Sequence, residues 1–108
     1  MAAFDDFTKA VKNGSGVLAK EIFGGLGKEA GKDSKAFLEK TEQDMQRWTK
    51  LLSAGELTEQ DFSDLVEAKQ ALAEIHELTR KGVALTKRER FRKGLIKLVV
   101  DSAVDVYL

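Results

Sequence analysis

The chain has 108 residues, of which 43% are hydrophobic and 33% are charged, and its 18 basic and 18 acidic side chains give a formal net charge of zero. A chain of this length forms one domain, and its apolar content argues against disorder because it can bury enough surface to offset the entropy of ordering. It contains no cysteine, which excludes a disulfide framework, a thiolate metal ligand and a cysteine nucleophile.

The first residues, Met1 to Asp6, lack the positive region and the long apolar run of a signal peptide. No stretch approaches the roughly 18 uncharged apolar residues that a membrane-spanning helix needs. We therefore expect a soluble, cytoplasmic protein.

Residues 4–31 are predicted to form a glycine-rich amphipathic helix, with a break at residues 13–16, where Asn-Gly-Ser-Gly disfavours helix. Apolar residues recur along one stripe, and lysines accompany it. This layout suits either close packing on a helical bundle or an anionic membrane surface. The apolar residues of that alternative membrane face are Phe4, Phe7, Leu18, Ile22, Phe23 and Leu26.

Two further helices are predicted at residues 34–54 and 59–81, each with an apolar stripe at helical spacing. Between them, Gly55 can adopt the left-handed conformation that ends a helix. Thr58 and Asp61 have the spacing of a capping box, a pattern that begins a helix. The short connection predicts an antiparallel hairpin. The expected apolar positions are Phe37, Leu38, Thr41, Met45, Trp48, Leu51 and Leu52 in the first helix and Phe62, Leu65, Leu72, Ile75 and Leu78 in the second.

The last segment, residues 95–108, fits a strand or a helix, because its β-branched residues also satisfy a two-residue period. A polar stripe at four-residue spacing favours the helix, and within it Lys97 can pair with Asp101. Gly82 predicts the end of the preceding helix. Thr86 and Glu89 have a second capping-box pattern, which predicts the start of the last helix. The stripe comprises Lys93, Lys97, Asp101 and Asp105.

Together these segments predict an all-α fold, a small antiparallel helical bundle of three robust helices plus the glycine-rich N-terminal helix. We expect a single domain over residues 1–108, in which residues 1–31 form the amphipathic segment and residues 34–108 the three-helix core. The last helix is apolar around most of its circumference, so it should be the central element of the bundle or offer a face to a partner.

Charge is unevenly distributed, with a net of −6 over residues 39–77 and +7 over residues 78–97. The basic run either lies against the acidic flank of the preceding helix or a neighbouring subunit, or binds an anionic partner. Nucleic acid is not expected, because the chain is neutral overall and only Phe91 lies within the run as a stacking aromatic. The predicted basic patch is Arg88, Arg90, Arg92 and Lys93.

No catalytic or metal-binding motif is complete. His76 begins a pattern like the zinc-protease helix, but Arg80 stands where the second imidazole is needed. A di-iron bundle needs a second histidine, and the chain has one. No nucleophile has an accompanying base. We expect no enzyme activity, no catalytic residue, no metal and no cofactor.

Residues 48–69 resemble the short C-terminal helical-hairpin family (SHOCT), whose pattern is Leu-rich, then Gly, an apolar residue, Thr, acids and Phe. The matching residues are Trp48, Leu51 and Leu52 followed by the run from Gly55 to Phe62. The family's Lys-rich turn after the Phe is missing here, since Lys69 stands alone. The resemblance implies a small interaction or oligomerisation element.

These observations predict a non-enzymatic protein-interaction or assembly module that self-associates as a homo-oligomer or binds an acidic protein partner. The basic patch would steer the partner, and an apolar side of the last helix would complete the contact. That apolar side comprises Phe91, Leu95, Val99, Val106 and Tyr107. The alternative is a peripheral membrane protein that binds an anionic lipid surface through residues 4–31.

Overall fold

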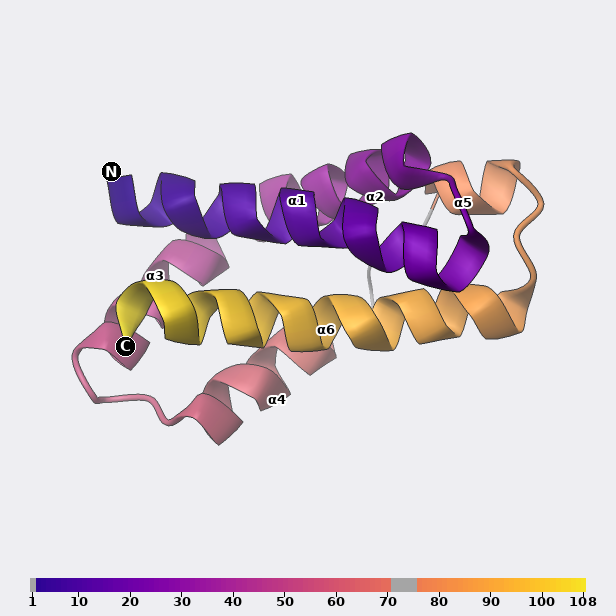
Figure 1. Cartoon of the computed structure of the whole chain (residues 1–108). Helices are drawn as coiled ribbons and strands as arrows, with labels where there is room; N and C mark the ends of the chain where they lie inside the picture. Colours follow the sequence, from indigo (N-terminus) through magenta and orange to yellow (C-terminus); the bar gives the residue numbers. More distant parts are fainter. Residues whose placement is uncertain (1, 71–75) are drawn as a thin grey trace.

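A computed structural model describes residues 2–70 and 76–108 and shows a helical bundle, which confirms the predicted fold class (Figure 1). The described residues form no strand, and the segment 95–108 is helical. The helices are α1 (Ala2–Phe23), α2 (Gly27–Lys40), α3 (Glu42–Ser53), α4 (Glu59–Gln70), α5 (His76–Arg80) and α6 (Leu85–Tyr107).

The two longest helices, α1 and α6, pair antiparallel and form the spine of the bundle (Figure 1). Aromatic contacts hold the pair near both ends: the ring centroids of Phe7 and Tyr107 are 6.3 Å apart, and those of Phe23 and Phe91 are 5.8 Å apart. The helix α2 packs along α1, whereas α4 packs mainly on α6. α6 thus contacts α1, α3 and α4.

Reciprocal contacts between leucine and glycine bring α1 and α6 close together. The side chain of Leu98 lies over Gly14, and that of Leu18 lies over Gly94. A Cβ atom added to Gly94 would be 2.8 Å from Leu18 Cδ2. The predicted break at residues 13–16 is therefore wrong: α1 continues through them, because tertiary packing uses the missing side chain of Gly14.

The first predicted helix instead ends at Phe23, so residues 4–31 do not form one helix. Gly24 has a φ angle of +75° and Leu26 of +64°, and these left-handed residues turn the chain back into α2. A left-handed conformation costs a leucine about 1–2 kcal/mol. Leu26 packs against the core, and this contact offsets part of that cost.

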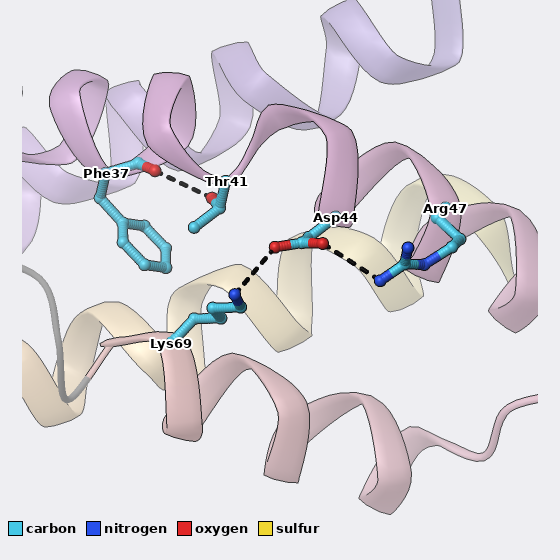
Figure 2. Close-up of polar contacts among 5 residues, drawn as sticks. All are labelled: Phe37, Thr41, Asp44, Arg47 and Lys69. Atoms are coloured by element: carbon cyan, nitrogen blue, oxygen red, sulfur yellow. Dashed lines mark hydrogen bonds and ion pairs between the residues drawn. The ribbon is translucent and has the colours of Figure 1, made fainter.

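The second predicted helix is divided at Thr41, where Figure 2 shows the chain bending from α2 into α3. The Thr41 hydroxyl donates to the carbonyl oxygen of Phe37 at 2.8 Å, a contact that bends helices. Beyond the bend, Asp44 forms an ion pair of 3.2 Å with Lys69 of α4 and one of 3.1 Å with Arg47 (Figure 2). The bend thus places α3 where it can contact α4.

The predicted turn between α3 and α4 is confirmed. Gly55 has a φ angle of +76°, and Glu56 N–H donates to the carbonyl oxygen of Leu51 at 2.9 Å. The capping box is reciprocal: Asp61 N–H donates to Thr58 Oγ1 at 3.0 Å, and Thr58 N–H donates to Asp61 Oδ2 at 3.3 Å. The sequence therefore specifies both the end of α3 and the start of α4.

The third predicted helix, residues 59–81, corresponds to α4 and α5. Residues 71–75, which include the expected apolar positions Leu72 and Ile75, lie outside the described part of the chain. A residue distant in the sequence anchors α5. The buried carboxylate of Asp33 accepts hydrogen bonds from the N–H groups of Glu77 and Leu78 at 2.9 and 3.0 Å. This contact fixes α5 on α2.

The start of α6 differs from the prediction. As expected, Gly82 is left-handed, with a φ angle of +75°. However, the residue before the helix is Ala84, with an extended ψ of 145° and no side-chain cap. The predicted capping box of Thr86 is therefore wrong, because Thr86 is already helical. Instead, Arg88 Nε donates to the Val83 carbonyl oxygen at 3.0 Å and ties the loop to the first turn.

The core draws residues from every helix and is continuous through the bundle. The largest fully buried side chains are those of Phe7, Phe62, Phe91, Met45, Leu78 and Leu95.

Candidate interaction surface

The predicted apolar contact on α6 is wrong for three of its five residues. Phe91 and Val99 are 0% exposed and Leu95 is 2% exposed, so they have no surface to offer to a partner. The reason is that α1 and α4 both pack on α6 and cover its apolar side. Val106 and Tyr107 are half-buried against the core.

The six residues of the alternative membrane face also pack inward. Phe7 is fully buried. The other five, Phe4, Leu18, Ile22, Phe23 and Leu26, are half-buried against the core cluster. Inserting this face into a lipid surface would require α1 to leave the bundle, and we therefore propose no membrane function.

The structure divides the predicted basic patch into two kinds of residue. Arg88 donates to Val83 and to Thr79 Oγ1, and Arg92 forms an ion pair of 2.8 Å with Glu89, so both support the local fold. Arg90 and Lys93 are exposed. Of the four residues, these two have the side chains best placed to meet a partner.

Cations from the first half of the chain join the basic run, which the sequence did not reveal. Lys28 and Lys32 of α2 line the same polar hollow as Arg80 and Lys81. They are about 50 residues apart in the sequence, and only the packing of α5 on α2 brings them together. The one sequence signal was the series of lysines in and just after residues 4–31, which includes Lys28 and Lys32.

Charge is consequently segregated along the long axis of the molecule. The turn between α1 and α2, the helix α5 and the start of α6 lie at one end in Figure 1, while both chain termini and α3 lie at the other. We call the first the basic end (residues 13–33 and 76–96), with ten cations and five carboxylates. The acidic end (residues 2–12, 34–70 and 97–108) has twelve carboxylates and eight cations.

The acidic end includes the outward face of α4 and the turn before it, whose carboxylates are exposed. These are Glu56, Glu59, Asp61, Asp64 and Glu67. The nearby cation Lys69 pairs with Asp44. The ion pairs seen for the basic run, Arg80 with Glu77 and Arg92 with Glu89, join residues three positions apart on one helix. The structure shows no ion pair between the basic run and the acidic flank of α4 among the described residues.

One side of the spine, where α1 and α6 lie side by side, faces the viewer in Figure 1 without another described helix in front of it. We call it the α1–α6 face. It carries a shallow, largely apolar groove of about 370 Å³, lined by Gly14, Val17, Leu18, Glu21, Gly94, Lys97, Leu98 and Asp101. Val17 is 60% exposed there and is one of three exposed large apolar side chains in the described residues, with Leu85 and Leu108.

Neither a metal cluster nor a membrane span is found in the described part of the chain. No three His, Asp or Glu side chains among residues 2–70 and 76–108 come together to hold a metal ion. None of the helices described combines the length and apolar character required to cross a bilayer. The side chain of His76 lies outside the described residues.

Comparison with known proteins adds no relative. A scan against protein-family models, a search of the curated proteins and a search of the solved structures each found no match. The resemblance of residues 48–69 to the SHOCT family stays a prediction. Function must therefore be argued from the surfaces of the chain itself.

Proposed function

We propose that this protein is a non-enzymatic interaction module that self-associates through its oppositely charged ends. The segregation of charge in a molecule of zero net charge carries this proposal. Two copies attract when the basic end of one lies beside the acidic end of the other, and they repel in the parallel arrangement. The charges thus favour one relative orientation.

The charge layout of α6 supports an intermolecular role. Its first turn contains no acidic residue and its last turn no basic residue, whereas Lys87 and Arg88 lie near the start and Asp105 near the end. This is the reverse of what the helix dipole favours, and each exposed charge costs about 0.3–1 kcal/mol. A second copy with the opposite layout would offset this cost.

The contact is expected to be mainly polar and weak, since Phe91, Leu95 and Val99 are buried in the core. Exposed ion pairs contribute about 0.2–1 kcal/mol each. At physiological ionic strength the Debye length is about 8 Å, so charges attract strongly only near contact. Self-association should therefore depend on both concentration and salt.

Light scattering behind size exclusion tests the proposal, at low and high salt and over a range of protein concentrations. We expect a mass above the 11.9 kDa of the monomer at low salt, falling toward that value as salt is added. A mass of one chain under every condition would overturn the proposal.

A paired set of variants identifies the surface. Arg90→Glu with Lys93→Glu reverses two exposed cations that make no ion pair within the described residues. These changes should abolish association. Lys40→Glu with Lys50→Glu makes the same charge change at two exposed cations of the acidic end, which likewise make no ion pair within the described residues, and should leave association in place. If both variants associate like the original chain, the basic end is not part of the contact.

A further inference from the structure

The polar stripe of α6 is exposed along its whole length. Lys93, Lys97, Asp101 and Asp105 are all exposed and follow one another at four-residue spacing. None of them forms an ion pair within the described part of the chain, and Lys97 and Asp101 do not pair with each other as the sequence suggested. The four charges are therefore available to a partner.

The order of these charges is self-complementary. The stripe reads Lys, Lys, Asp, Asp along the helix, with its midpoint at Val99. If a second α6 helix lies antiparallel across that midpoint, Lys93 of one copy faces Asp105 of the other, and Lys97 faces Asp101. The two-fold axis repeats both contacts, which gives four ion pairs. A parallel second helix in register would place like charges opposite each other.

We propose that two copies dock face to face through the α1–α6 face, with their α6 helices antiparallel around a two-fold axis at the level of residue 99 along α6. This inference rests on the proposed self-association and names its geometry. It also agrees with the charge of the whole molecule, because an antiparallel pair places the basic end of each copy beside the acidic end of the other.

The groove supplies an apolar part of the same contact. Lys97 and Asp101 belong to its lining, so a partner that pairs with them also covers the groove and the exposed side of Val17. Removing this apolar surface from water favours the dimer without any change in the core.

The size of the face sets the expected strength of the dimer. The molecule is 41 Å long and 21–24 Å across. Contact over about half of this length would cover on the order of 400 Å² per copy, which is below the roughly 600–1,000 Å² per partner of stable interfaces and in the range of weak, transient contacts. The dimer should therefore be weak and in rapid exchange, and trapping it by a covalent bond is the most direct test.

Because the natural chain contains no cysteine, a disulfide can form only between the introduced cysteines. In the proposed dimer, Lys93→Cys of one copy faces Asp105→Cys of the other. In a dimer of two Lys93→Cys chains, the two introduced cysteines would instead lie about 18 Å apart along the helix direction, since twelve residues rise about 1.5 Å each. A disulfide needs Cα atoms within about 7 Å.

Under mild oxidation, a mixture of the two single-cysteine chains should form the mixed disulfide-linked dimer. Either chain alone should form little disulfide-linked dimer. Glu67→Cys on the exposed face of α4, mixed with Asp105→Cys, serves as the matched control and should link at least tenfold less. A chain with both cysteines should give a closed covalent dimer and nothing larger. Circular dichroism checks that each variant keeps its helical content.

The results separate this inference from the proposed function. If the natural chain associates but the mixed dimer forms no better than the control, the geometry is wrong while self-association stands. A ladder of larger products from the double-cysteine chain would show head-to-tail contacts and also overturn the two-fold dimer. If the natural chain is a monomer under all conditions and no mixed dimer forms, both proposals fail.

Discussion

The close packing of α1 on α6 predicts an unusual response to alanine at Gly14. Replacing glycine by alanine inside a helix normally stabilises it by about 0.5–1 kcal/mol. At Gly14, however, the new Cβ atom would lie 2.9 Å from Leu98 Cδ2 and 3.2 Å from Leu98 Cγ. The head of Leu98 must move, so Gly14→Ala should destabilise the protein.

The magnitude follows from two opposing contributions. Overpacking a well-packed contact costs about 1–3 kcal/mol, and the gain in helix propensity offsets up to about 1 kcal/mol of this. The net loss is therefore about 0–2.5 kcal/mol. Gly16, two residues away on the same helix, has no atom within 4 Å of its added Cβ, so Gly16→Ala should stabilise the protein.

Thermal unfolding followed by circular dichroism compares the two variants directly. A change of 1 kcal/mol shifts Tm by roughly 4–8 °C in a domain of nearly this size, so the Tm of Gly16→Ala should lie above that of the natural chain and the Tm of Gly14→Ala at or below it. Adding Leu98→Ala should remove most of the penalty at Gly14, and a double-mutant cycle measures that coupling. Equal stabilisation by both alanines would refute the assigned packing of α1 on α6.

Three other substitutions test local features of the fold by urea unfolding. Asp33→Ala should cost about 1–3 kcal/mol because it leaves the amides of α5 without their buried acceptor, and a cost as small as that of Asp5→Ala, at an exposed position, would contradict this role. Gly55→Ala should cost about 1 kcal/mol, since its φ is +76°, and Gly55→Asn should cost less. Thr58→Ala should cost about 0.5–2 kcal/mol through loss of the capping hydrogen bond, whereas Thr58→Ser should be nearly neutral.

The sequence predicted features whose causes are local. Gly55, Thr58 and Asp61 specify the turn between α3 and α4 through their own backbone preferences and hydrogen bonds. The stripe from Lys93 to Asp105 correctly favoured a helix over a strand. Each of these signals acts within a few residues, so no knowledge of the packing was needed to read it.

Features that depend on distant parts of the chain could not be read in the same way. The continuity of α1 through Gly14 depends on Leu98, and the position of α5 depends on Asp33. The division at Thr41 occurs where its hydroxyl bonds to Phe37, but Thr49 makes the same kind of bond to Met45 without interrupting α3, so the helical pattern does not reveal where the chain bends. In each case a tertiary or side-chain contact overrides the local propensity.

The candidate surface shows the same division between local and distant causes. The sequence identified the basic run and its imbalance with the acidic segment. It placed Phe91, Leu95 and Val99 on the contact, however, although the structure buries them. An apolar helix side gives the same pattern whether it packs on its own bundle or on a partner, and only the positions of α1 and α4 distinguish the two.

The most direct test of charge-driven self-association is a mixing experiment with two reversed stripes. One variant carries Lys93→Asp and Lys97→Asp, which makes its α6 stripe wholly acidic, and the other carries Asp101→Lys and Asp105→Lys, which makes it wholly basic. Light scattering at low salt should find each variant monomeric alone, because like charges face each other, and should find a dimer when they are mixed in equal amounts. If the mixture stays monomeric while the natural chain associates, or if each variant alone associates as the natural chain does, the charges of α6 do not direct the assembly.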